Sequence, residues 1–489
     1  MTRQDPSSGT AGSSEYACPP SVLLGMCIGV SMYWLFALSM GPLLPSIGKE
    51  FGLVAADPNL SLAMSLAGLV AGICIMPAGG LADRFGRVRL TRIGLAVGLA
   101  GMLLCGLATG VPMIIAGRFF QGLSAAIVMP ATLALVKVYY SDADRPRALS
   151  YWSMSTFGCA SVSSIFGGII ATHVGWRWAF LLAVPCIALS FLLLRSAPER
   201  KVDGGKGKAF DGLGFAVLII GLLALNLFVS KGRAWGWTSF ASLAALGTFV
   251  VTLAIFIPNE LRHPAPIADL SLLKRRSFTG AVIANLLINS LIGVLVVILT
   301  YLQKGRGLTA MQAGLLTLGY TATVLSLIRV GEKLGKRTGP RLPMVLGGLS
   351  FAVMAMLLSC TFITDNTTYF TIVFIGLAFQ GVGLGLFATP ATNAAVGEAP
   401  AEKAGLAGGI FKMGSSLGGA FGIAIHLAIF AAVLANSKGN MHLAARASIG
   451  FGLIPALASA AVAYFLSPGR KAEPSAAIAP ALQAGRIGA

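Results

Sequence analysis

Charge is scarce in this sequence: 11% of its 489 residues are Asp, Glu, Lys or Arg, whereas 56% are hydrophobic and the mean hydropathy is +0.82. Soluble domains carry about 25% charged residues. The low charge therefore excludes an ordinary water-soluble domain and indicates a chain whose main solvent is lipid. The 36 Lys and Arg against 17 Asp and Glu lie mostly in short loops between apolar runs. Membrane orientation explains that pattern, so we expect no nucleic-acid partner.

Cysteine is also infrequent, with seven residues, and six of these lie inside apolar segments. Their spacing matches neither a zinc site nor a disulfide framework, so we interpret them as small packing residues and expect no metal or cofactor. The chain also lacks a HExxH motif and a Ser/His/Asp grouping, which argues against a membrane enzyme. No long polar segment offers a signalling domain, and the first 20 residues do not resemble a cleaved signal peptide.

Long apolar runs, in contrast, are abundant. A span needs about 17–25 apolar residues as a helix, and such windows occur at 21–47, 60–79, 91–109, 112–136, 149–171, 178–195, 212–230, 237–257, 278–302, 309–328, 342–362, 369–396, 404–434 and 444–466. Lipid offers no hydrogen-bond partner to the backbone, so these segments must be helices; the alternating strands of a β-barrel are absent. We predict an all-α polytopic membrane protein with 14 transmembrane helices.

The basic residues predict the orientation. With a cytoplasmic N-terminus, 26 Lys and Arg fall on the inside, two lie within spans, and only eight fall outside: Lys49, Arg177, Lys231, Arg233, Lys304, Arg306, Lys438 and Arg446. Positive charge is retained on the cytoplasmic side, so this distribution predicts that both termini are cytoplasmic. Both termini on one side also require an even number of spans.

Two halves of the sequence are related. Residues 79–89, after the second span, and residues 331–341, after the tenth, share the pattern Leu-x-x-Arg-x-Gly followed by a further Arg. Gln121-Gly122 in the fourth span likewise reappears as Gln380-Gly381 in the twelfth. Two related halves around a central site are a transporter design, and they favour a carrier over a channel.

This repetition predicts a division of the chain. It comprises a tail (1–20), a six-helix half (21–195), a cytoplasmic loop (196–211), two inserted helices (212–257), a second loop (258–277), a second six-helix half (278–466) and a final tail (467–489).

The segment after the second span reads Gly-Gly-Leu-Ala-Asp-Arg-Phe-Gly-Arg over residues 79–87, and its glycines favour a tight turn. It resembles the signature of the major facilitator superfamily. The resemblance implies the major facilitator fold, with two six-helix halves that alternate in access and a conformational switch at Gly79, Asp83, Arg84, Gly86 and Arg87.

Two further motifs extend the resemblance. Arg118 with Gln121 and Gly122 in the fourth span resembles the family's second motif, in which the Arg is linked to proton coupling or gating. An Arg inside an apolar helix costs at least about 2.5 kcal/mol to insert, so it should face protein or a wet cavity. Residues 175–180 (Gly-Trp-Arg-Trp-Ala-Phe) and 403–409 resemble hallmarks of the fourteen-helix drug:proton antiporter branch. A twelve-span member with two interfacial segments is the alternative.

The sequence departs from that branch in its acids. The branch has an Asp in the first span, where this chain has Phe36, and no Asp or Glu falls in the middle of a predicted span. The spans do contain cations or potential cations, at Arg118, Lys412 and His426. A cavity with cations and no acid should disfavour cationic drugs and accept neutral or anionic amphiphiles. We name Phe36, Met40, Lys412 and His426 as candidate cavity residues.

These observations predict a secondary transporter of a bacterial cytoplasmic membrane that exports amphiphilic small molecules by alternating access. By resemblance, protons would drive the export and the unit would be a monomer in the lipid bilayer. An organic-anion or metabolite carrier with weak or no proton coupling is the alternative, and the pH dependence of counterflow distinguishes the two.

Overall fold

The computed structural model describes residues 19–53, 57–140, 144, 147–148, 151–152, 154–199, 211–263, 270–396 and 404–469, and every regular element among them is helical. The predicted tails and the predicted loop at 196–211 lie largely outside the described residues, as do residues 264–269 of the loop at 258–277. The first half comprises α1 (Pro20–Ser31), η1 (Met32–Ala37), α2 (Met40–Glu50), α3 (Pro58–Phe85), α4 (Arg87–Gly106), α5 (Val111–Tyr139), η2 (Met154–Gly158), α7 (Cys159–His173), α8 (Trp178–Leu181), α9 (Ala183–Leu193) and η3 (Leu194–Ser196).

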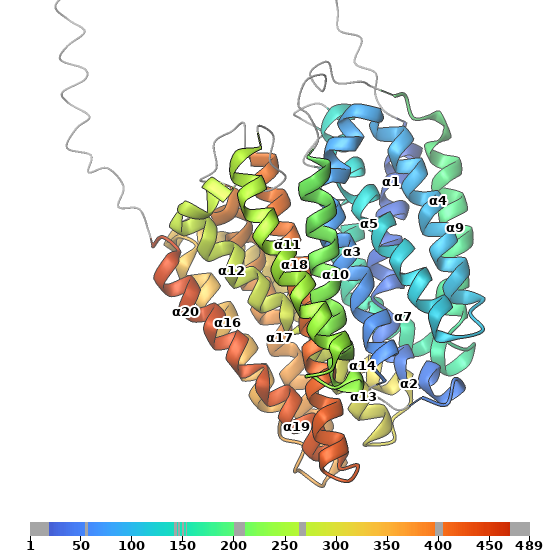
Figure 1. Ribbon diagram of the computed structural model, residues 1–489, viewed down its shortest axis with the longest axis vertical. Helices are drawn as coiled ribbons and strands as arrows, with labels where there is room; N and C mark the ends of the chain where they lie inside the picture. The colour runs from blue at the N-terminus through green and yellow to red at the C-terminus, as the bar shows by residue number, and fades with distance from the viewer. Residues whose placement is uncertain are drawn as a thin grey trace, which may run out of the picture.

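Two helices, α10 (Gly212–Trp235) and α11 (Phe240–Arg262), follow the first half. The second half then comprises η4 (Leu270–Lys274), α12 (Arg276–Ser290), α13 (Ile292–Lys304), α14 (Ala310–Leu315), α15 (Leu318–Thr338), α16 (Arg341–Leu358), α17 (Asn366–Val396), α18 (Ala404–Asn436), α19 (Met441–Phe451) and α20 (Leu453–Leu466). Figure 1 shows the first half in blue and cyan beside the second in yellow to red, with α10 crossing in front of their junction.

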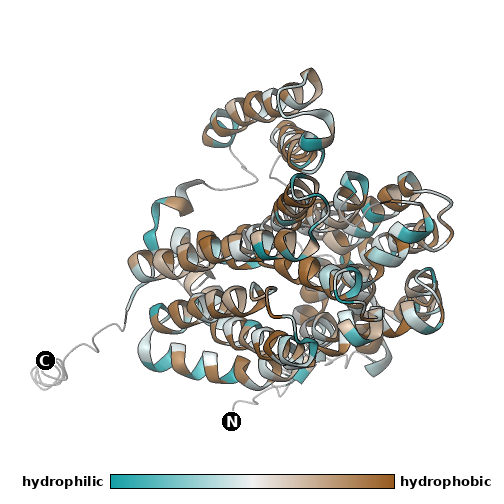
Figure 2. Ribbon diagram, turned by 90° about the horizontal axis from the view of Figure 1, so that it is seen from below, coloured by the Kyte–Doolittle hydropathy of each residue, from teal (hydrophilic) through white to brown (hydrophobic). Residues whose placement is uncertain are grey.

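The predicted fourteen spans agree with the helices. Within the described residues, 13 helical stretches are long and apolar enough to cross a membrane, and the bent pair Pro20–Phe36 and Met40–Glu50 makes a fourteenth if it is one span. Figure 2 shows that hydrophobic, brown residues dominate the ribbons. The 53° bend follows a π-helical turn, η1, which is a known cause of helix kinks. Both α10 and α11 are long and apolar enough to cross a membrane, as the fourteen-span prediction requires.

Two of the described acids cap the beginnings of helices. Asp57 accepts hydrogen bonds from the Asn59 and Leu60 amides and begins α3, whose first residue is Pro58. Asp211 begins α10 in the same way by accepting from the Gly214 amide at 2.8 Å. A side-chain oxygen at this position satisfies an amide that has no partner within the helix. These carboxylates therefore define where spans begin instead of entering the hydrocarbon.

Glycines set the helix spacing. A Cβ on Gly122 of α5 would approach the Ala67 carbonyl oxygen of α3 to 2.5 Å, and one on Gly314 of α14 would approach the Ser164 oxygen of α7 to 2.7 Å. On α18, Gly418 faces the Leu286 backbone in the same manner. Small residues allow membrane helices to approach closely. The α18 backbone at Gly418 therefore packs closely against α12.

One local prediction is wrong. Gly79 and Gly80 do not form a turn, because α3 continues as a helix to Phe85 and only Gly86 has a positive φ, of +102°. The connection to α4 is this single residue. The related segment of the second half behaves alike, since α15 runs to Thr338 and Gly339, with φ +81°, precedes α16. A helix needs no glycine to continue, whereas a reversal within one residue needs the left-handed region that glycine enters freely.

Candidate functional site

The turn between α3 and α4 is held by a carboxylate. Glu199, which follows η3, accepts hydrogen bonds from the Val88 amide at 3.1 Å and the Arg89 amide at 2.8 Å. These are the second and third residues of α4, whose exposed amides and dipole favour an anion. A Cβ on Gly86 would meet this carboxylate at 2.7 Å. Gly86 therefore provides both the positive φ and the space that Glu199 requires.

Further bonds join this turn to its neighbours. Arg92 donates to the Leu194 carbonyl oxygen at 2.7 Å, Arg87 donates to the Ala134 oxygen of α5 at 3.4 Å, and the Tyr139 hydroxyl donates to the Pro198 oxygen at 2.6 Å. The start of α4, the end of α5 and the segment after η3 thus form one connected unit. Of the predicted switch residues, Gly79, Gly86 and Arg87 are described here. Asp83 and Arg84 lie on α3, and their side chains are outside the described part of the chain.

Arg118 links α5 to α3. Arg118 is 2% exposed, and its guanidinium donates to the Ala63 oxygen at 3.0 Å, to the Met64 oxygen at 3.3 Å and to Gln121 Oε1 at 2.7 Å. The position of Gly122, in contact with the α3 backbone, brings the two helices close enough for these bonds. The structure thus brings Arg118, Gln121 and Gly122 together in one buried unit that faces protein, as expected for an Arg in lipid surroundings.

The second half repeats this unit without its cation. Gly381 of α17 packs against the Tyr320 backbone of α15, as Gly122 packs against α3. Leu377, however, stands three residues before Gln380, where Arg118 precedes Gln121. Gln380 Oε1 is buried and has no hydrogen-bond partner. The two halves therefore share packing but differ in charge, and the buried guanidinium belongs to the first half.

Lys412 extends from α18 of the second half toward the first half. Its Nζ lies 4.8 Å from the centroid of the Trp34 ring in η1, a cation–π arrangement. Within the described residues Lys412 has no hydrogen bond or ion pair, and the Trp34 Nε1 has none either although it is buried. Ser415, one turn along α18, accepts a hydrogen bond from Asn285 of α12 at 2.6 Å.

The other predicted cavity residues lie elsewhere. His426 is 1% exposed and packs between α18 and α19, where its Nδ1 lies 2.8 Å from the Ser448 carbonyl oxygen. Phe36 is buried against the Phe166 ring of α7, with ring centroids 5.1 Å apart, and Met40 is fully buried in α2. Of the four, only Lys412 is half-buried and joins the two halves.

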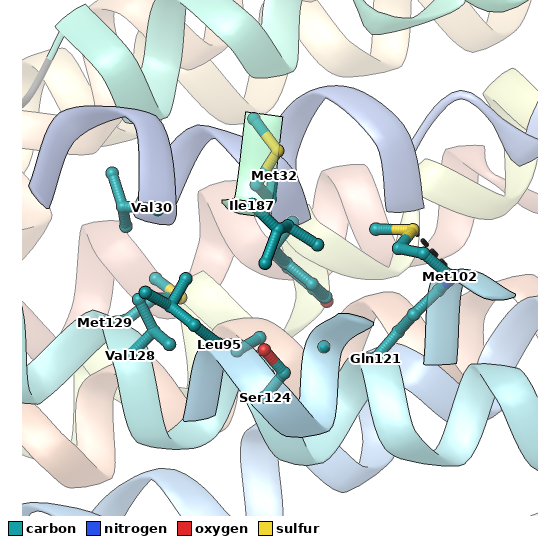
Figure 3. A pocket seen from close by; sticks show the side chains of 13 residues that line it. Val30, Met32, Leu95, Met102, Gln121, Ser124, Val128, Met129 and Ile187 are labelled. Carbon is teal, nitrogen blue, oxygen red and sulfur yellow. Dashed lines mark hydrogen bonds between the residues drawn. The ribbon is translucent and has the colours of Figure 1, made fainter. Parts of the chain in front are cut away.

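A small cavity lies inside the first half, behind η1. Figure 3 shows Leu95, Met102, Gln121 and Ile187 around it, and Gln121 donates to the Met102 sulfur at 3.2 Å. The volume that the centre of a water molecule can occupy is about 20 Å³, so the cavity holds about one water. The cavity is therefore too small for an amphiphilic substrate.

The two halves contact each other toward the predicted outer side. The Met311 amide of α14 donates to Thr172 Oγ1 of α7 at 3.0 Å, Gln303 of α13 donates to the Pro42 oxygen at 3.2 Å, and Thr321 of α15 donates to the Ser161 oxygen at 2.8 Å. The ends of α2 and α8 are also joined there, because Arg177 forms an ion pair with Glu50 at 2.6 Å.

Comparison with models of known protein families agrees with this fold. The model of the family described as Major Facilitator Superfamily matches residues 25–422 and 278–485. The chain belongs to the Major Facilitator Superfamily. It is therefore a multi-span membrane transporter rather than an enzyme, and the fold predicted from its sequence is confirmed.

Curated relatives within the Major Facilitator Superfamily cover most of the chain. The Quinolone resistance protein NorB of Staphylococcus aureus strain MRSA252 is 40% identical over 435 residues, which cover 88% of this chain and 93% of that protein. NorB of strain JH9 is 40% identical over 412 residues, covering 84% and 88%.

Solved transporters of the same fold resemble the chain in structure. A POT family transporter in complex with 5-aminolevulinic acid has a TM-score of 0.66 at 15% identity, covering 91% of this chain and 95% of that one. The xylose transporter XylE from E. coli, in a partially occluded inward open conformation, has a TM-score of 0.61 at 14% identity, covering 93% and 98%. At these identities the likeness concerns the fold.

Sequence reasoning missed Glu199 and the partner of Lys412. Glu199 is the first acid in a mainly basic stretch after the sixth span, a signal that was available in the sequence. Trp34 is one of several aromatic residues in the spans, and its spacing does not distinguish it from packing residues. Only the approach of η1 to α18 selects it.

Proposed function

We propose that this chain exports amphiphilic small molecules from a bacterial cell by alternating access, as a monomer in the cytoplasmic membrane with both termini inside. The observation that carries the proposal is the 40% identity to a quinolone resistance protein over 88% of the chain. The contacts between the halves on the predicted outer side support it, because they suit a state whose central site opens to the cytoplasm.

The test is accumulation of a quinolone in a host that lacks its own exporters. Cells that express the chain should accumulate less compound and tolerate more of it, and collapse of the proton gradient should remove the difference. A tag at each terminus should be accessible only from the cytoplasmic side. Unchanged accumulation across a panel of amphiphiles, or tags on opposite sides, contradicts the proposal.

The conformational switch is proposed at the α3–α4 turn, through Gly79, Asp83, Arg84, Gly86 and Arg87, with Glu199 as the group that holds α4. The support is the connected hydrogen bonding of this turn to α5 and to the end of the first half. A rigid turn of this kind moves as one body with its half, which is what alternating access requires.

Proton coupling is proposed at Arg118, with Gln121 and Gly122 as its positioning residues. Replacing Arg118 with Lys preserves a cation but cannot reproduce the three directed bonds to Ala63, Met64 and Gln121. We expect Arg118→Lys to keep counterflow in proteoliposomes, which moves no net proton, and to lose accumulation driven by a pH gradient. Equal loss of both activities would make Arg118 a packing residue, and equal retention would favour the uncoupled organic-anion carrier.

A further inference from the structure

Two hydrogen-bond donors without acceptors meet at the junction of the halves. Lys412 carries an ammonium with three donors, and the Trp34 indole offers one donor and no acceptor. The indole N–H is buried and unpaired, and the Lys412 ammonium lies over the face of the same ring without a hydrogen bond or ion pair to any described residue. A buried donor without a partner costs about 1–3 kcal/mol. The arrangement is therefore complete only when an acceptor enters.

The charge of the missing acceptor follows from the surroundings. The acids of the described spans lie at helix ends, where Asp57 and Asp211 cap α3 and α10 and Glu50 pairs with Arg177. No described carboxylate therefore neutralises Lys412 from within the protein. An unneutralised cation in a region of low dielectric attracts an anion strongly.

The neighbouring side chains suit an aromatic body. Tyr33, Trp34 and Trp152 pack together over Val30 and Met129 in the first half. Trp152 already donates its own N–H to Thr132 Oγ1 at 3.1 Å, so it contributes apolar surface, whereas the Trp34 N–H is buried and has no partner among the described residues. Opposite them, the polar face of α18 presents Lys412 beside Ser415.

We propose that Lys412 and Trp34 bind the carboxylate of an aromatic acid, with one carboxylate oxygen accepting from the ammonium and the other from the indole N–H. The ring system of the ligand lies against Tyr33 and Trp152. Because the two donors belong to opposite halves, a bound carboxylate also joins the halves at the central site. This inference rests on the proposed export function and specifies its substrate class.

The test compares a quinolone carboxylic acid with its methyl ester, which keeps the ring system and loses the charge. Binding to the purified full-length protein is measured by calorimetry, and transport is measured in proteoliposomes. We expect Lys412→Gln to weaken binding of the acid about tenfold or more and to leave the ester unchanged, as loss of a charge-assisted bond predicts. Lys412→Arg should restore most of the affinity for the acid.

Trp34→Phe isolates the indole donor, because it keeps an aromatic face for the cation and removes only the N–H. We expect this variant to bind the acid several-fold more weakly and to bind the ester as tightly as wild type does. Lys231→Gln is the matched control: Lys231, near the outer end of α10, already bonds to Asn59 on α3. Retained ester binding shows that each variant is folded.

The outcomes separate the two proposals. If Lys412→Gln binds the acid as tightly as wild type does, and neither protein distinguishes the acid from the ester, the inference is overturned. If wild type nevertheless transports either compound, the export function still stands. Selective loss of the acid in Lys412→Gln, without transport of either compound by wild type, supports the inference and contradicts the export function.

Discussion

Single residues in this transporter are tied to backbone groups more than to one another. Glu199 binds two amides of α4, and Arg118 binds two carbonyl oxygens of α3. In a bilayer this is expected, because a backbone group without a partner is costly and a charged side chain can satisfy it. A conservative substitution therefore tests geometry and charge together.

Glu199→Gln is the first residue-scale prediction. The amide keeps one oxygen acceptor but loses the charge that suits the start of α4, so the cap should weaken by about 1 kcal/mol. We expect faster hydrogen exchange at the Val88 and Arg89 amides and a lower transport rate at unchanged expression.

The matched control is Glu332→Gln in the related segment of the second half, where Glu332 pairs with Lys336 on an exposed helix face. Surface pairs of this kind contribute little. If the two substitutions slow transport equally, Glu199 has no special role at the turn.

At the scale of helices, glycine positions decide which pairs can pack. Gly122 permits the α3–α5 contact that places Arg118 on the Ala63 and Met64 oxygens. Gly381 permits the equivalent contact of α17 with α15, although no cation depends on it there. Both halves thus use the same glycine packing, whether or not a buried cation such as Arg118 accompanies it.

Gly122→Ala should therefore separate α3 from α5. The added methyl group would lie 2.5 Å from the Ala67 oxygen, and overpacking of this kind costs about 1–3 kcal/mol. We expect a lower midpoint of thermal unfolding in detergent and loss of proton-driven transport.

Gly247→Ala on α11 is the control, because nothing lies within 4 Å of the added group. There the change should be neutral or raise stability by about 0.4–1 kcal/mol through reduced freedom of the unfolded chain. Similar effects of the two substitutions would contradict the assigned role of the α3–α5 contact.

For the whole molecule, alternating access requires that the contacts between Thr172 and Met311 break and re-form in each cycle. The amide of Met311 lies 3.0 Å from Thr172 Oγ1, so the two residues are neighbours, and we expect cysteines at these positions to form a disulfide on oxidation. In a background without native cysteines, oxidation of Thr172→Cys/Met311→Cys should stop transport, and reduction should restore it.

Each single cysteine variant serves as a control for the reagents. Continued transport by a fully cross-linked protein would show that the outer ends stay together, and the alternating-access proposal would then fail. Loss of transport before oxidation would instead point to damage from the substitutions, which the single variants reveal.

The number and type of spans follow from sequence, because hydrocarbon imposes one solution on any apolar run of sufficient length. The motif at residues 79–87 could be located from sequence, but its backbone conformation could not be predicted correctly. A pattern of glycines does not reveal that Gly79 continues a helix while Gly86 reverses the chain. Likewise His426 and Lys412 are alike in sequence, as lone cations or potential cations in the same helix.

By itself, then, the sequence determined the solvent of this protein, its helical class, its repeated halves and the scarcity of acids within its spans. The tertiary structure decided which of the two side chains, His426 or Lys412, lacks a hydrogen-bond acceptor. His426 lies within hydrogen-bond distance of the Ser448 carbonyl oxygen of α19, whereas the one polar partner of Lys412 among the described residues is an aromatic ring face across the junction of the halves. The physical reason is that a partner's position depends on helix packing, which brings together residues separated by hundreds of positions in the chain.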